Sequence, residues 1–80
     1  IYGKVPKGDL VLAENCMRKA IQVEPDTVFF HLTLAQILIE KDKKTEALSH
    51  LEIASKLNPS ETLEIQHQKD AVQLLKKLKK

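Results

Sequence analysis

One pattern of small and large apolar residues occurs twice in this chain of 80 residues. The first copy reads AENCMRKAIQVEP from position 13, and the second reads ALSHLEIASKLNP from position 47, which is 34 residues later. Each copy starts with alanine and has a large apolar residue four positions on, a second alanine after seven and a proline after twelve. Steps of three and four place these side chains on one face of an α-helix, and proline disfavours helical geometry at the residue before it. The repeat therefore predicts two equivalent amphipathic helices.

The rest of the chain also has helical spacing. Apolar residues recur at steps of three or four, while two glycines and three prolines leave few positions for turns. We expect helices over residues 9–24, about 27–40, 47–57 and 61–80, with Asp9 as the N-cap of the first. No stretch has the alternating pattern of a strand, so the predicted fold class is all-α.

The last predicted helix has one apolar stripe and one basic side. The stripe is made of Leu63, His67, Ala71, Leu74, Leu75 and Leu78. The opposite side carries Lys69, Lys76, Lys77 and Lys80. We expect the stripe to close the core and the lysines to face solvent, which would make this helix a C-terminal cap. In the alternative, the terminal lysines bind acidic surfaces, and added salt would then weaken that binding steeply.

The unit that contains the second copy resembles the tetratricopeptide repeat, a 34-residue pair of helices. Where the family has a bulky residue, a leucine, a small residue and a large residue, this chain has His31, Leu34, Ala35 and Leu38. Asp42 stands where the family has a turn glycine, which the first copy keeps as Gly8. The resemblance implies an α-solenoid of about one and a half repeats plus a C-terminal capping helix, with protein binding as its function.

The resemblance divides one domain, residues 1–80, into four parts. Residues 1–8 would be a remnant and linker, 9–24 the second helix of an incomplete repeat, 27–59 a complete repeat and 61–80 the cap. Since the chain begins with Ile rather than Met, we expect it to be a piece of a longer protein.

A second resemblance rests on a shorter motif. The segment GKVPKG at residues 3–8, with the acidic start, Ala71 and Leu74-Leu75 of the last helix, is similar to the C-terminal part of the regulator of microtubule dynamics family and its bacterial relatives. It would imply an adaptor without catalytic chemistry. The microtubule and membrane-contact roles of eukaryotic members need other segments and are not carried over.

The incomplete first repeat leaves an apolar face without its partner helix. This face consists of Ala13, Met17 and Ala20. Exposed apolar surface forfeits roughly 25 cal/mol per Å². We therefore expect the missing helix to come from a longer chain, from a second copy of this chain or from another partner, and we predict self-association through these three residues as one alternative.

The helix over residues 27–40 is apolar on most of its circumference, so we expect it to be packed on two sides. Tetratricopeptide arrays bind extended peptides on the concave face, which the first helix of each unit lines. The matching positions here are Phe29, Leu32, Thr33, Gln36 and Glu40. Phe29 is either a recognition residue or a contact to a neighbouring helix. The family's clamp for C-terminal carboxylates has Lys and Asn where this chain has Leu32 and Gln36, which argues against that ligand.

Catalytic and metal chemistry find little support in the sequence. The histidines, His31, His50 and His67, fall on three different helices without metal-ligand spacing, and we expect His31 to be a packing residue. Cys16 is expected to be half-buried and unreactive, because no base is placed beside it. The carboxylates, Glu14 and Glu46 among them, are expected on solvent faces. We predict no catalytic residue, no metal and no cofactor.

Composition narrows the class of partner. The net charge of +2 is too small to indicate nucleic acid, and no aromatic residue accompanies the lysine-rich end for stacking on bases. No apolar run reaches the ~18 residues of a membrane span, and a single cysteine fits a reducing compartment. We expect a cytoplasmic protein with a protein or peptide partner and no binding to nucleic acid or membrane.

Overall fold

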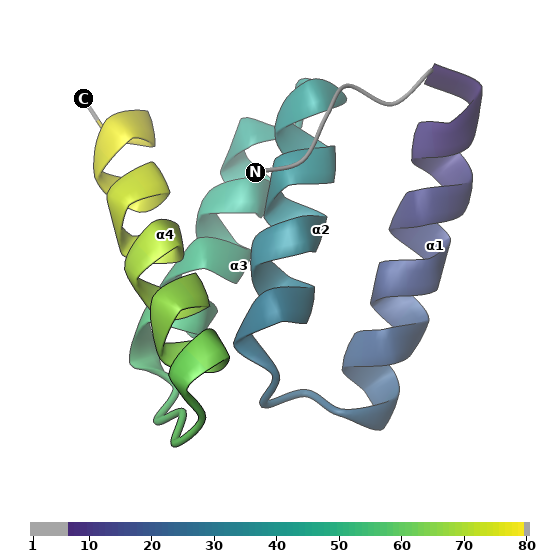
Figure 1. The fold of residues 1–80 in the computed structure, drawn as a ribbon. Helices are drawn as coiled ribbons and strands as arrows, with labels where there is room; N and C mark the ends of the chain where they lie inside the picture. The colour runs from purple at the N-terminus through teal and green to yellow at the C-terminus, as the bar shows by residue number, and fades with distance from the viewer. Residues whose placement is uncertain (1–6, 80) are drawn as a thin grey trace.

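The structure, a computed structural model, describes residues 7–79, and over this range it contains helices and no strand. The four helices are α1 (Lys7–Val23), α2 (Val28–Glu40), α3 (Lys44–Lys56) and α4 (Thr62–Leu78) (Figure 1). Consecutive helices run in opposite directions, and α1 and α4 lie at opposite ends of the bundle (Figure 1). The all-α prediction is confirmed. Residues 1–6 of the expected remnant lie outside the described residues.

Most predicted helix boundaries are close to those observed, and Pro25 lies in the turn after α1 and Pro59 in the loop after α3, as expected. The N-cap predicted at Asp9 is wrong, because α1 begins at Lys7 and Asp9 falls inside its first turn. A carboxylate in the first turn still interacts favourably with the partial positive charge of the helix N-terminus. The acidic residue thus marks the start of the helix without capping it.

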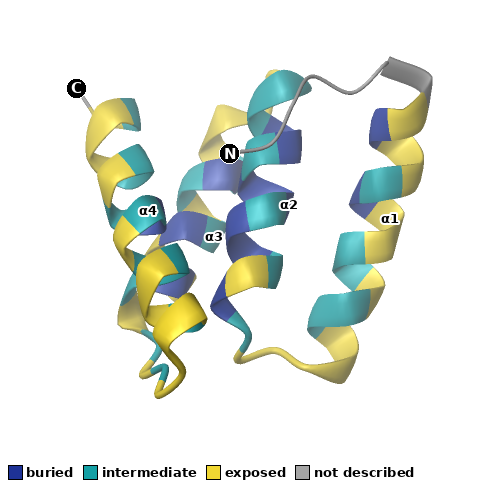
Figure 2. Cartoon of the chain, viewed as in Figure 1, coloured by how far each residue is buried: buried dark blue, intermediate teal, exposed yellow. Residues whose placement is uncertain are grey.

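Helix α2 is the centre of the core. It packs against α1, α3 and α4, which confirms that a helix apolar on most of its circumference is covered on more than one side. Its buried residues are Val28, His31, Leu32, Leu34, Ala35, Ile37 and Leu38. Figure 2 shows this helix largely buried, while the outer sides of α1 and α4 are exposed. Burial of such a face, rather than helix propensity, stabilises helices of this length.

The two sequence copies have different surroundings. In α3, Ala47, Leu51 and Ala54 are fully buried, because α3 packs against both α2 and α4. In α1, Ala13 and Ala20 remain half-buried, because α1 packs along α2 and is joined to α3 by the Arg18–Glu46 ion pair rather than by a packed face. The same pattern therefore closes a core in one copy and leaves apolar surface in the other.

The turn after α2 requires a left-handed residue. Asp42 has φ 61°, and Lys43 N–H donates to Leu38 O at 2.8 Å while Asp42 N–H donates to Ile39 O at 3.1 Å. These two bonds are those of a Schellman motif, in which the left-handed position favours glycine. The sequence interpretation of Asp42 as a residue in a glycine position therefore has a conformational basis.

Helix α4 covers α2 and α3 with most of its apolar stripe. Ala71 is fully buried, and Leu74, Leu75 and Leu78 pack against the core. Leu63 was expected in the same stripe, but 73% of it is exposed. It lies in the first turn of α4, where the neighbouring Glu64 rather than Leu63 meets the start of α2. Lys69, Lys76 and Lys77 are exposed as predicted, whereas Lys80 lies outside the described residues.

Candidate functional site

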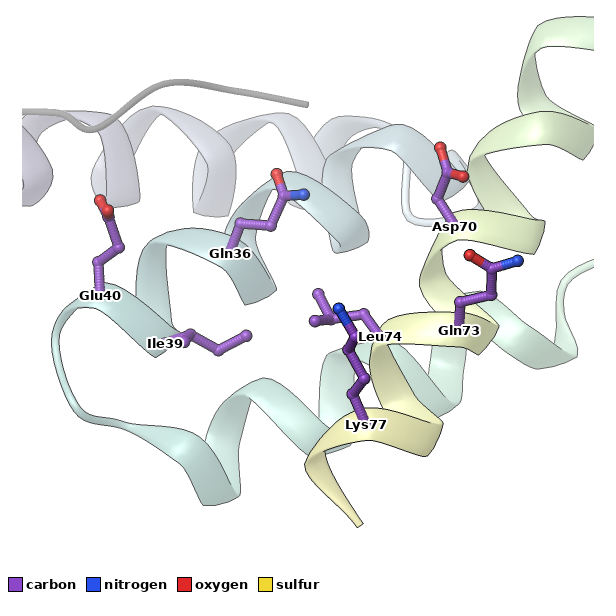
Figure 3. A pocket seen from close by; sticks show the side chains of 7 residues that line it. All are labelled: Gln36, Ile39, Glu40, Asp70, Gln73, Leu74 and Lys77. Atoms are coloured by element: carbon purple, nitrogen blue, oxygen red, sulfur yellow. The ribbon is translucent and has the colours of Figure 1, made fainter. Parts of the chain in front are cut away.

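A groove of about 330 Å³ lies between α2 and α4 (Figure 3). Its lining residues are Gln36, Ile39, Glu40, Asp70, Gln73, Leu74 and Lys77. Spacings of three and four residues place the contributors from each helix on one helical face. In Figure 3, Ile39 and Leu74 point toward each other across the groove, while the carboxylates of Glu40 and Asp70 point away from this pair. The groove thus has an apolar floor with amides, carboxylates and one ammonium at its edge.

The predicted binding residues separate into two groups. Gln36 and Glu40 line the groove, as expected for a binding face on this helix. Leu32 does not belong to an accessible face, because only 2% of it is exposed and it lies among the core side chains. Thr33 is half-buried beside the groove and is not one of its lining residues.

Phe29 makes the helix contact that was one of its two alternatives. Its ring centroid lies 4.9 Å from that of His67 in α4, at an interplanar angle of 49°, and 42% of the residue is exposed. Tilted aromatic pairs at this distance are attractive. Phe29 therefore helps to hold α4 against α2, and it does not line the groove.

Sequence reasoning missed the contribution of α4 to the groove. Asp70, Gln73, Leu74 and Lys77 were interpreted only as parts of a cap. Their spacing of three, four and seven residues places them along one edge of the helix, and this was the available signal. Without knowing which edge faces α2, that spacing alone cannot be distinguished from an ordinary solvated face.

Glu40 is the least satisfied polar group of the described residues. Its Oε2 atom is buried and has no hydrogen-bond partner among them. Glu40 also borders a second hollow of about 260 Å³, which Leu10, Lys41 and Asp42 complete. A buried carboxylate oxygen without a donor costs about 1–3 kcal/mol or more. The side chain thus lies between two cavities with an unused acceptor.

An ionic network centred on the buried Glu14 joins the end of α2 and the start of α3 to α1, and its outer members Arg18 and Glu46 are partly exposed. Glu14 accepts hydrogen bonds from Lys41 Nζ and from Arg18 Nε, the latter at 2.8 Å, and Arg18 also pairs with Glu46. The hydrogen bonds from Lys41 and then Arg18 lower the pKa of Glu14 to about 2, although burial opposes this shift. The expectation that Glu14 faces solvent is wrong, since only 7% of it is exposed. Arg18 lies four residues after Glu14 in α1, whereas Lys41 follows α2, and sequence spacing did not reveal that partner.

Two histidines that the sequence placed apart meet between α2 and α3. His31 Nδ1 lies 3.1 Å from His50 Nδ1, and His31 Nε2 lies 2.8 Å from Pro25 O. A carbonyl only accepts, so Nε2 of His31 carries a proton, and of the two facing Nδ1 atoms one must donate and the other accept. Among residues 7–79 no three His, Cys, Asp or Glu side chains form a group that could hold a metal ion.

The side of α1 that faces away from α2 is partly apolar. Leu12 is 65% exposed and Val23 is 80% exposed, and Cys16 between them is exposed rather than half-buried as expected. Met17, in contrast, packs against the core, although it was predicted at a self-association face. The available apolar surface on α1 is therefore made of Val11, Leu12, Cys16 and Val23, with the half-buried Ala13 and Ala20.

Comparison with protein-family models, with curated proteins and with solved structures found no match to this chain. Among the described residues, no helix combines the length and the apolar character that crossing a membrane requires.

Proposed function

We propose that this chain is a non-catalytic protein-interaction module of the tetratricopeptide type, which takes an extended partner segment in the groove between α2 and α4. The observation that carries this proposal is the groove itself, where Gln36 and Glu40, chosen from sequence as binding residues, stand opposite Asp70, Gln73 and Lys77. An apolar floor with a few convergent polar groups is the usual composition of a binding site.

The repeat supports the tetratricopeptide reading. Its unit of 34 residues corresponds to α2 and α3, the turn between them has a left-handed residue at the glycine position, and α1 repeats the pattern of α3. A solenoid stacks such units so that the first helices of successive units line one face. In this proposal α2 and α4 are those helices, and the groove is the start of the concave face.

The experiment is a selection of peptides from a phage-displayed random library on the purified chain. The selected peptides are then tested on a Gln73→Trp variant. Gln73 is exposed at the edge of the groove, so the larger ring would fill the space and block it. The control is Gln22→Trp, at an exposed position on α1. We expect peptides that bind the wild type and the control but lose at least about tenfold in affinity with Gln73→Trp. If every selected peptide binds Gln73→Trp equally well, the groove is not the binding site.

The exposed face of α1 favours a second candidate, self-association. Helix α4 offers little matching surface for end-to-end stacking, because its exposed residues beyond Leu63 and Ile65 are polar, among them Gln66, Lys69 and Lys76. In this alternative the α1 faces of two copies therefore pair with each other, in the isologous arrangement of a two-fold dimer. Light scattering during size-exclusion chromatography should then give a dimer that Leu12→Glu converts to a folded monomer. A concentration-independent monomer of the wild type excludes this alternative.

A further inference from the structure

We propose that the segment held in the α2–α4 groove carries an arginine or lysine, whose positive charge binds Glu40. This inference rests on the proposed function and names the chemistry of the partner. It starts from an acceptor without a donor: Glu40 Oε2 is buried and unpaired among the described residues. A cationic donor is the best partner for such a group, because charge-assisted hydrogen bonds are about twice as strong as neutral ones.

The charges around Glu40 favour a cation over an anion. Glu40 and Asp70 line the groove, and Asp42 lies in the adjoining hollow. Lys41, also in that hollow, already pairs with Glu14, so its charge is largely compensated. Lys77 is then the one remaining ammonium against three carboxylates in these two linings. This face is locally acidic, although the chain as a whole has a formal charge of +2.

The shape of the groove matches a long basic side chain. Ile39 and Leu74 form its apolar floor, and Glu40 follows Ile39 directly along α2 (Figure 3). Arginine and lysine lay their aliphatic stems on apolar surface and keep the charged head at its edge. The stem would lie over Ile39 and Leu74, and the head would pair with Glu40 once that side chain, which points away from Ile39 and Leu74 in Figure 3, turns toward the groove and uncovers its buried oxygen. The side-chain amides of Gln36 and Gln73 remain available to form hydrogen bonds with the backbone of the same segment.

Two substitutions with opposite effects test the proposal, using peptides selected as above and sensitive to Gln73→Trp. Glu40→Gln removes the negative charge at nearly constant shape and should weaken binding of the peptides about tenfold or more. Lys77→Gln removes the competing ammonium and should strengthen binding. Glu24→Gln, an exposed glutamate in the turn after α1, is the control and should leave affinity unchanged. Titration calorimetry measures each affinity, and thermal melts monitor folding.

The peptide supplies a second readout. Replacing its arginine with citrulline, or its lysine with norleucine, should reproduce the loss caused by Glu40→Gln, and combining both changes should add little. Groove-binding peptides without a basic residue, or with affinity unaffected by Glu40→Gln, would overturn this inference and leave the proposed function standing. Acidic peptides that Lys77→Gln weakens would also overturn it. If no peptide is sensitive to Gln73→Trp, the proposed function and the inference both fall.

Discussion

The side chain of Glu64 caps the backbone of Val28, which lies 36 residues earlier in the chain. Glu64 Oε1 accepts the amide of Val28 at 2.7 Å, and Oε2 accepts the amide of Phe29 at 3.1 Å. The local N-cap residue of α2, Thr27, makes no side-chain capping bond. A carboxylate from α4 therefore satisfies two of the free amides at the start of α2 and meets the positive end of its dipole.

Replacing Glu64 with alanine should destabilise the fold by about 1–2 kcal/mol, the range measured for the loss of helix caps. Urea unfolding followed by circular dichroism gives this difference in the free energy of unfolding. Glu61→Ala is the matched control, since Glu61 is exposed one turn earlier and makes no side-chain capping bond. Equal stabilities of the two variants would show that the long-range cap contributes nothing.

The positions and types of the helices could be predicted from sequence, whereas the bonds that join them could not. The alanines of α3 and the prolines after α1 and α3 follow local rules of spacing, so their roles in packing and in ending the helices could be predicted. Glu64 and Gln68 reach backbone atoms on other helices: Gln68 Nε2 donates to Ala54 O at 3.1 Å and Leu57 O at 2.5 Å, at the end of α3. Such partners are set by how helices cross, which no single helix encodes.

Glu14→Gln should lower the stability at neutral pH by about 1–3 kcal/mol, because the charges of Lys41 and Arg18 lose their common partner. The loss should depend on pH. The pKa of Glu14 is lowered to about 2 in the folded state, so its contribution is fully present above the unfolded pKa of about 4.3. It disappears as the pH falls from about 5 toward 2.

Unfolding in urea at several pH values between 2 and 7 measures this dependence. The wild type and Glu14→Gln should differ most above about pH 5 and converge in acid. Glu24→Gln, at an exposed glutamate, serves as the control and should follow the wild type. A constant difference between wild type and Glu14→Gln across this range would mean that packing, rather than charge, accounts for the loss.

Asp42→Gly should stabilise the protein by about 0.5–1 kcal/mol. Asp42 has φ 61°, a conformation that is strained for L-residues but not for glycine, and the relief of this strain outweighs the greater flexibility of glycine in the unfolded chain. The Schellman bonds of the turn should remain. Thermal denaturation of the wild type, Asp42→Gly and Asp42→Ala measures the effect, and Asp42→Ala should be the least stable of the three. A destabilised glycine variant would show that the Asp42 side chain supports the turn.

The polar residues that α2 contributes to the groove could be predicted from the sequence, whereas those from α4 could not. Gln36 and Glu40 follow from the periodicity of one strongly apolar helix, because its few polar positions must lie on its remaining free edge. Asp70 and Gln73 belong to a helix with a broad polar side, where periodicity does not select one edge. The meeting of His31 and His50 was unpredictable for the same reason as Glu64: 19 residues and a turn separate them, and only the packing of α2 on α3 brings the rings together.

The His31–His50 pair should make stability fall in mildly acidic solution. Burial, and then the neighbouring His31, lower the pKa of His50; Glu46 opposes this shift and Arg18 adds to it. A histidine whose pKa is lowered by folding contributes stability above its unfolded pKa of about 6.5, and loses it as the pH falls through that value toward the folded pKa. With both rings protonated, two N–H groups would face each other across 3.1 Å, so the hydrogen bond between them would be lost.

Ring resonances of His50 in an NMR titration report its pKa directly, and we expect a midpoint below 6.5. In parallel, the free energy of unfolding of the wild type should decrease as the pH falls below about 6.5 more steeply than that of His50→Gln, which keeps a hydrogen-bonding side chain without titrating. The comparison isolates this pair from Glu14, whose contribution changes mainly below pH 5. A midpoint at or above 6.5, or equal slopes for the two proteins, would contradict the prediction and would mean that the stacked rings are held independently of their protonation.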